Sequence, residues 1–273
     1  RDLQRLQDGS WDCVIDTCGW VPDVVEASAS FFQHRASQYV FVSTGSVYAD
    51  FSHIGIDENS ATSQVCYQPG QVLDETLMGG LKALCEHAVA TWFPSRALII
   101  RAGALVGRGD PLHRVAYWTR RVARGGEVLA PGKPDRGIQL IDVQDLAEWV
   151  IRMIEDRDGG TFNTMSPPAT LTMGDLIETC RCVCNPDAKI SWVSDQILAS
   201  QGICPSALPF WIPTSMPQFA GLYAMDSRKA VASGLHFRKL AETIRSTANL
   251  RPAESVPPPA GWLSTAAAAN LLA

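Results

Sequence analysis

Short apolar runs alternate with longer amphipathic stretches over the first part of the chain. The runs at 11–19, 38–44 and 97–107 are apolar and end in small residues, which predicts buried strands. The stretches at 22–34 and 72–92 between them have the length and spacing of helices. This order of elements predicts an α/β protein with a parallel sheet.

The remainder of the chain has a different pattern, which predicts a mainly helical second part with one short strand at 189–193. The stretch Ile197–Met225 carries no charge, but four prolines interrupt it, so we expect a stiff apolar loop and not a membrane span. Asp145 and Glu148 have the spacing of a capping box, so we expect Asp145 to cap a helix. Helices are expected at 172–184, 194–200, 227–233, 239–249 and 264–273.

Composition narrows the class of protein. The 273 residues are 46% hydrophobic, enough for a substantial core, and a net charge of −5 argues against binding nucleic acid through its phosphates. The eight cysteines and the lack of a recognisable signal peptide favour a reducing, cytoplasmic location. Cys180, Cys182 and Cys184 suggest a metal site, but no further Cys or His cluster completes a tetrahedral set, so we expect no metal.

Two segments carry candidate chemistry. Val42-Ser-Thr44-Gly-Ser46-Val-Tyr48 ends a predicted strand, and Met78-Gly-Gly-Leu-Lys82 lies on the next predicted helix. A spacing of four residues places the Met78 and Lys82 side chains on one helix face, one turn apart. Met78 has a thioether, which has no proton to give and accepts hydrogen bonds only weakly.

These segments resemble the active site of the extended short-chain dehydrogenases/reductases, the NAD-dependent epimerases and dehydratases. In that family a Ser or Thr hydroxyl beside a strand works with a Tyr-x-x-x-Lys pair on a helix. Thr44 matches the hydroxyl and Lys82 matches the lysine, whereas Met78 occupies the tyrosine position. The resemblance implies a Rossmann-like domain at 1–164, a substrate domain at 165–273, and a contribution from 108–137 to the substrate cleft.

The resemblance also implies that the methionine lowers the rate of the reaction. In the family the phenol exchanges a proton with the substrate oxygen while hydride moves to or from nicotinamide. A free phenol has a pKa of about 10, so the lysine is needed to favour phenolate near neutral pH. Losing a positioned acid–base group typically lowers the rate roughly 100- to 10,000-fold. We therefore expect oxidoreductase activity to be impaired by Met78.

Further site residues follow from the resemblance and from strand ends, because open α/β sheets bind ligands at the carboxyl ends of their strands. For NAD or NADP, the candidates are Thr17, Cys18, Gly19, Lys82, Ala102 and Gly103. For a small-molecule substrate, the candidates are Ser46, His113, Arg114, Trp118 and Arg121.

Each candidate has a structural alternative. Thr44 alternatively caps the strand, Lys82 extends from the helix surface to solvent, and Gly19 serves only the turn. His113 and Trp118 alternatively serve packing. Arg114 and Arg121 lie seven residues apart on one helix face, which fits either an anion clamp or a solvated surface.

The glycine-rich turn that holds a dinucleotide pyrophosphate is not found after any predicted strand. By the resemblance, about 60 residues at roughly 30 per βαβ unit would precede the first strand. Either the sequence is a fragment, or it is a natural protein without this loop. In both cases we expect weak NAD(P) binding and an exposed sheet edge that favours association, such as a homodimer.

Two functions from different classes remain. The first is an NAD(P)-dependent epimerase, dehydratase or reductase acting on a sugar nucleotide or another hydroxylated metabolite, with low turnover. The second is a non-catalytic protein on the same fold that binds or senses a cofactor or metabolite. Relatives of this fold include RNA-binding proteins, but the acidic balance makes RNA the least favoured ligand.

Overall fold

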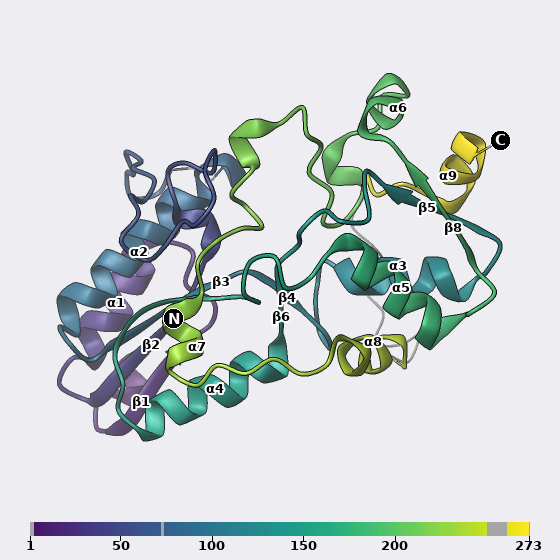
Figure 1. Cartoon of the computed structure of the whole chain (residues 1–273). Helices are drawn as coiled ribbons and strands as arrows, with labels where there is room; N and C mark the ends of the chain where they lie inside the picture. Colours follow the sequence, from purple (N-terminus) through teal and green to yellow (C-terminus); the bar gives the residue numbers. More distant parts are fainter. Residues whose placement is uncertain (1–2, 72–73, 250–260, 273) are drawn as a thin grey trace.

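The computed structural model describes residues 3–71, 74–249 and 261–272. Its main sheet contains β1 (Trp11–Asp16), β2 (Ala36–Thr44), β3 (Ala97–Ala102) and β7 (Gly160–Thr164) in the order β1-β2-β3-β7. Every neighbouring pair in this sheet is parallel (Figure 1). The predicted α/β fold with a Rossmann-like parallel sheet is therefore confirmed. Within the described residues β1 pairs only with β2, so one of its edges has no strand beside it.

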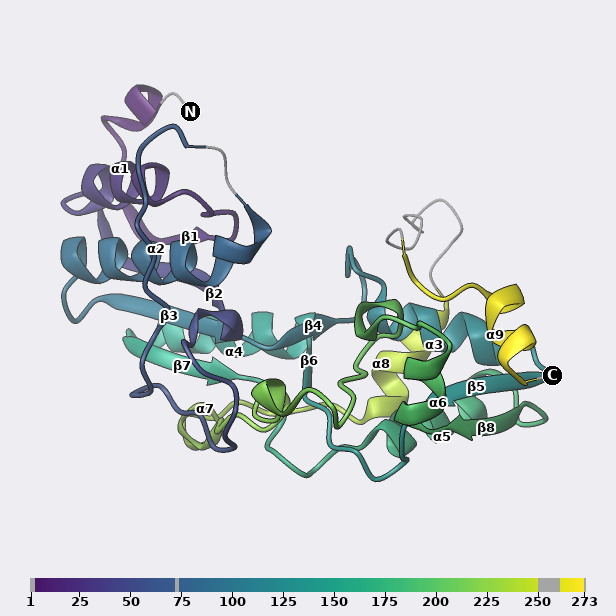
Figure 2. The ribbon, with the colours of Figure 1, turned by 90° about the horizontal axis from the view of Figure 1, so that it is seen from above.

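Helices cover both faces of this sheet (Figures 1 and 2). On one face α1 (Pro22–Phe32) and α2 (Met78–Trp92) pack on Tyr39 and Phe41 of β2. On the other face α4 (Val143–Glu155) and α7 (Arg228–Ala232) pack on Val40 and its neighbours. Successive strand residues point to opposite faces, so the apolar run 39–42 of β2 serves two cores.

The rest of the chain forms a second group of elements, joined to the first through β4 (Ala104–Val106) and β6 (Leu140–Asp142) (Figure 2). A two-stranded sheet of β5 (Glu127–Pro131) and β8 (Lys189–Val193) lies there. Its helices are α3 (Arg114–Ala123), α5 (Met173–Cys184), α6 (Asp195–Ser200), α8 (Leu240–Ala248) and α9 (Thr265–Leu272). The 3-10 helices of the chain are η1 (Leu3–Leu6), η2 (Gly45–Val47), η3 (Glu75–Leu77), η4 (Pro205–Ala207) and η5 (Pro217–Phe219). Residues from α3, β5, α5 and α8 share one apolar core. The division into domains at residue 164 stays a prediction.

The strand expected at 97–107 is wrong as a single element. It ends at Ala102, and β4 starts at Ala104 in another sheet. Gly103 lies at the break, where a Cβ atom would come within 2.7 Å of Met165. The chain therefore leaves the main sheet at a residue with no side chain, and the apolar pattern does not register that change.

Two helix starts also differ from expectation. The helix expected from residue 72 is α-helical only from Met78, after the turn η3, while residues 72–73 lie outside the described part. The cap of α4 is Asp142, whose carboxylate accepts a hydrogen bond from the Gln144 amide at 2.9 Å. The prediction that Asp145 is the cap is wrong, because its carboxylate instead accepts a hydrogen bond from Arg238 at 2.6 Å. Among the described helices, none has the length and apolar character needed to cross a membrane.

Candidate functional site

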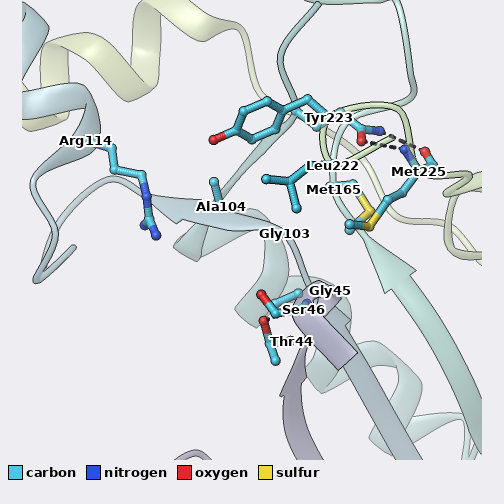
Figure 3. Close-up of a pocket in the computed structure, with 12 residues that line it drawn as sticks. Thr44, Gly45, Ser46, Gly103, Ala104, Arg114, Met165, Leu222, Tyr223 and Met225 are labelled. Carbon is cyan, nitrogen blue, oxygen red and sulfur yellow. Dashed lines mark hydrogen bonds between the residues drawn. The ribbon is translucent and has the colours of Figure 1, made fainter. Parts of the chain in front are cut away.

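A pocket of about 160 Å³ opens where β2 and β3 end (Figure 3). One wall is Thr44, Gly45 and Ser46, at the carboxyl end of β2. A second wall is the backbone of 102–104, where the chain leaves β3 for β4. These two walls contain four sequence-predicted site residues, Thr44, Ser46, Ala102 and Gly103.

The Thr44 hydroxyl shapes the first wall. Its oxygen accepts a hydrogen bond from the Ser46 amide at 3.1 Å and caps the turn η2. A hydroxyl that accepts this bond still has its own proton to donate. Thr44 therefore caps the turn after β2 and also lines the pocket.

Lys82 is buried, lies one turn from the start of α2, and is not among the residues that line the pocket. Its ammonium donates to the Gly19 carbonyl oxygen at 2.9 Å and to the Val42 carbonyl oxygen at 2.6 Å. The ammonium also lies 4.2 Å from the Phe41 ring centre. Burial lowers the pKa of Lys82, although nearby acidic groups oppose this. These two bonds tie the chain after β1 to β2, and among the described residues one of the three ammonium N–H groups makes no hydrogen bond.

Met78 is half-buried and is the first residue of α2. The next residue, Gly79, packs so closely against the wall that a Cβ atom there would lie 2.1 Å from the Ser46 carbonyl oxygen. The start of α2 is thus held directly against the Thr44–Ser46 turn. Met78 itself is not among the residues that line the pocket.

The residues predicted to bind cofactor at the end of β1 do not line the pocket, and β1 lies beside β2 on the side away from β3. Thr17 and Cys18 are exposed, and the Cys18 amide donates to the Asp16 carboxylate at 3.0 Å. Gly19 is buried, and a Cβ atom there would lie 2.6 Å from Val25. Gly19 is therefore required by packing as well as by the turn.

These features fit only part of a nicotinamide dinucleotide. Lys82, with one free N–H group beside the strand ends, suits the hydroxyls of a ribose. The link from β1 to α1, however, is Thr17-Cys-Gly-Trp-Val21, and it has a single glycine. No strand-to-helix turn in the described residues has the glycine-rich sequence that suits a pyrophosphate.

Most of the residues in the remaining walls were not selected by the sequence analysis. Those walls consist of Arg114 at the start of α3, Gln139, Met165, and the segment 222–225, which supplies Leu222, Tyr223 and Met225. Of these, only Arg114 was a predicted site residue. The Met225 amide donates a hydrogen bond to the Gln139 side-chain oxygen at 2.8 Å, and the Gln139 side-chain NH₂ donates to the Met225 carbonyl oxygen at 2.9 Å. Gln139 therefore fixes segment 222–225 over the pocket.

Three other predicted substrate residues do not line the pocket. Trp118 is fully buried and donates to the Pro209 carbonyl oxygen at 3.3 Å. Arg121 is buried against the Tyr117 ring, 5.3 Å from its centre, which favours packing over an anion clamp. His113 is buried just before α3 with a left-handed φ of 49°, and its Nε2 has no hydrogen-bond partner in the part of the chain that the structure describes.

The burial of His113 predicts a pH effect on stability. Burial lowers the pKa of its imidazole below the usual 6.5, and Arg120 adds to this effect. Since the unfolded chain binds the proton more readily, stability is fully present above the unfolded pKa and is lost as pH falls through the folded pKa. We expect the melting temperature to fall between about pH 7.5 and about pH 5, and His113→Asn to reduce that fall. Asparagine tolerates the left-handed backbone. The exposed His236→Asn is the control, and an equal fall in all three proteins would contradict the assignment.

A buried polar network anchors the Thr44–Ser46 wall of the pocket. Glu86 of α2 and Arg101 of β3 form an ion pair at 2.8 Å, and both side chains are less than 10% exposed. The Ser43 hydroxyl donates to Glu86 at 2.5 Å, and Arg101 donates to the Tyr48 hydroxyl at 3.2 Å. Tyr48 donates onward to the Asn163 side chain at 2.6 Å. The network joins both segments that flank the Thr44–Ser46 turn to β3 and β7.

Comparison with known proteins gives the family. A model of the NAD dependent epimerase/dehydratase family matches residues 21–164, more than half of the 273-residue chain. The chain belongs to this family. The match spans the Thr44 turn, α2 and Lys82, so the predicted family is confirmed. No curated protein matches the chain by the same standard.

Solved structures of family-like enzymes share the fold. UDP-N-acetylglucosamine 4-epimerase from Bacillus cereus is 15% identical to the chain, with a TM-score of 0.62. The match covers 90% of this chain and 81% of the epimerase. The human epimerase family protein SDR39U1 with NADPH is 16% identical at a TM-score of 0.59, covering 90% and 86%. The dTDP-4-dehydrorhamnose reductase from Bacillus anthracis with NADP is 15% identical at 0.58, covering 89% and 80%. At these identities the likeness establishes the fold.

Proposed function

We propose that this protein binds a nicotinamide dinucleotide and a hydroxylated metabolite, such as a sugar nucleotide, at the carboxyl edge of its main sheet. We further propose that its oxidoreductase turnover is low. The observation that carries the proposal is the placement of Thr44, Lys82 and the start of α2 around one sheet edge, with Met78 where the family has tyrosine. The epimerase and reductase structures that share the fold support the substrate class.

The roles of the side chains follow from their free donors. The Thr44 hydroxyl donates to a substrate oxygen and polarises the C–O bond, because its lone pair already accepts the Ser46 amide. The remaining N–H group of Lys82 holds ribose hydroxyls of the cofactor. When bound, the nicotinamide supplies or accepts the hydride. No proton reaches the substrate from position 78, because a thioether carries none.

The binding experiment uses calorimetry or NMR titration with NAD⁺ and NADPH. We expect dissociation constants on the order of 1 mM, about −4 kcal/mol, because the described residues offer no pyrophosphate cradle. Lys82→Met is expected to abolish binding, while Lys189→Met, at an exposed position on β8, is the matched control. Binding that survives Lys82→Met unchanged would refute the assigned cofactor site.

The same absence of a proton donor favours a second candidate, a binding or sensing protein without turnover. It shares the first candidate's ligands and differs only in chemistry. Ligand binding in the wild-type protein with no detectable turnover on any sugar nucleotide would select it.

A further inference from the structure

Four groups enclose the Lys82 ammonium. Two carbonyl oxygens, of Gly19 and Val42, accept its hydrogen bonds at 2.9 Å and 2.6 Å. Two aromatic rings, of Trp20 and Phe41, face it with their centres 5.3 Å and 4.2 Å away. As a result, Lys82 is only 4% exposed. A ribose therefore reaches the remaining N–H group only if one of these four groups moves.

Three of the four groups are fixed by their own packing. Phe41 is fully buried in the core that α1 and α2 form with β2. Val42 offers a backbone oxygen from within β2, which lies between β1 and β3 in the sheet. Gly19 has so little room that a Cβ atom there would lie 2.6 Å from Val25 and 2.7 Å from Phe41. Moving any of these groups would disrupt the sheet or its close-packed core.

Trp20 is the exception among the four. It is 50% exposed, although tryptophan is a highly buried residue on average. It lies in the link between β1 and α1, outside both elements, and its indole N–H makes no hydrogen bond with the described residues. A ring that is already half in water loses little apolar burial by turning outward. The contact that it gives up is a single cation–π contact, which is weak beside the packing of the other three groups.

We propose that the Trp20 ring is a gate over Lys82, so that the ribose site is closed in the free protein and opens when this ring turns outward. The inference rests on the proposed function, which assigns ribose hydroxyls to Lys82, and it adds the conformational step that precedes binding. A site that is open for only part of the time binds its ligand more weakly, in proportion to the open fraction. The gate therefore lowers the affinity of the protein for a nicotinamide nucleotide.

Chemical labelling of lysine tests the gate without a ligand. Reductive methylation followed by mass spectrometry gives the reaction rate at each lysine. We expect Lys82 to react far more slowly than the exposed Lys189 in the wild-type protein, and about 3- to 30-fold faster in Trp20→Ala than in the wild-type protein. Trp20→Phe keeps a ring over the ammonium and is expected to preserve most of the protection. Equal reactivity of Lys82 in the wild-type and Trp20→Ala proteins would overturn the inference.

Titration with NADH tests the gate at the proposed cofactor site. We expect Trp20→Ala to bind NADH about 3- to 30-fold more tightly than the wild-type protein, because no ring has to turn away. Trp20→Leu, with a smaller side chain and no π face, is expected to give a smaller gain in the same direction. Unchanged binding in Trp20→Ala would overturn the gate. Weaker binding would also overturn it, because Trp20 would then be a surface on which the ligand stacks.

Controls attribute the gain to the ring over Lys82. Trp192→Ala removes a half-buried indole from β8 and is expected to leave both NADH binding and Lys82 labelling unchanged. Lys82→Met is expected to abolish NADH binding with Trp20 or alanine at position 20. Melting temperatures check that each variant is folded. A gain of the same size in Trp192→Ala would mean that a general loosening of the protein, and not the gate, is responsible.

The two experiments separate a failure of the gate from a failure of the proposed function. NADH binding that is lost in Lys82→Met and unchanged in Trp20→Ala would leave the proposed function standing and overturn the gate. Faster labelling of Lys82 in Trp20→Ala, without NADH binding by either protein, would uphold the gate and count against the cofactor site.

Discussion

Replacing Glu86 with glutamine is expected to lower the free energy of unfolding by about 3–5 kcal/mol, because it leaves the Arg101 charge buried without a counter-ion. Both side chains are less than 10% exposed, so water cannot take over the lost bonds. Burial opposes the charge on Arg101, yet the hydrogen bonds and charge of Glu86 outweigh it and raise the pKa of the guanidinium. Urea denaturation of the wild-type and variant proteins measures the difference.

A double-mutant cycle separates the ion pair from ordinary packing. Glu86→Leu with Arg101→Met removes both charges and keeps the volume, so it is expected to be closer to wild type than either single change. Glu178→Gln, at an exposed ion pair on α5, is the comparison and should show no similar loss. A loss of less than about 1 kcal/mol in Glu86→Gln would mean that water reaches the pair in solution.

The effect of Glu86→Gln should extend to the site. Arg101 also donates to the Tyr48 hydroxyl, and Tyr48 lies two residues beyond Ser46. Ser43, just before Thr44, donates to Glu86. The Thr44–Ser46 turn is thus anchored on both sides by one network, and removing Glu86 releases an anchor. Hydrogen exchange at the turn amides would report that loosening.

The sequence predicted the elements that a local pattern specifies. The apolar run 38–44 predicted β2, the amphipathic stretch 22–34 predicted α1, and the helix expected at 172–184 is α5 (Met173–Cys184). Each of these signals lies within a few residues of the structure that it predicts. Thr44 and Lys82 were selected through the resemblance to a known active site, whose two motifs are also short local patterns.

The rest of the pocket could not be predicted, because it is assembled from distant segments. Tyr223 lies in the uncharged stretch 197–225, where proline spacing indicates a loop but not what the loop covers. Gln139 reaches segment 222–225 across 86 residues of sequence, and no local pattern encodes that bond. Arg114 and Arg121 share a face of α3 but lie two turns apart. Arg114 lines the pocket, whereas Arg121 contacts Leu263 in the core.

Introducing the missing phenol is expected to have the largest functional effect. In Met78→Tyr we expect turnover on a sugar-nucleotide substrate to rise roughly 100- to 10,000-fold, the usual contribution of a positioned acid–base group. Residue 78 begins α2 directly beside the Thr44–Ser46 turn, and Lys82 lies one helical turn on. A cation at that position favours phenolate and so lowers the pKa of the new tyrosine. The absorbance of the nicotinamide follows the reaction.

Met78→Phe is the matched control, because it adds the ring without the hydroxyl. If the gain comes from proton transfer, Met78→Tyr exceeds Met78→Phe by nearly the whole effect, and adding Lys82→Met to Met78→Tyr removes most of it. Equal rates in Met78→Phe and Met78→Tyr would attribute the gain to shape. Rapid turnover by the wild-type protein, not raised by Met78→Tyr, would mean that the proton comes from another group and that the methionine does not limit the chemistry. Comparable, undetectable turnover in all variants that still bind ligand would favour the sensing protein, because restoring the acid–base group would then have failed to restore a reaction.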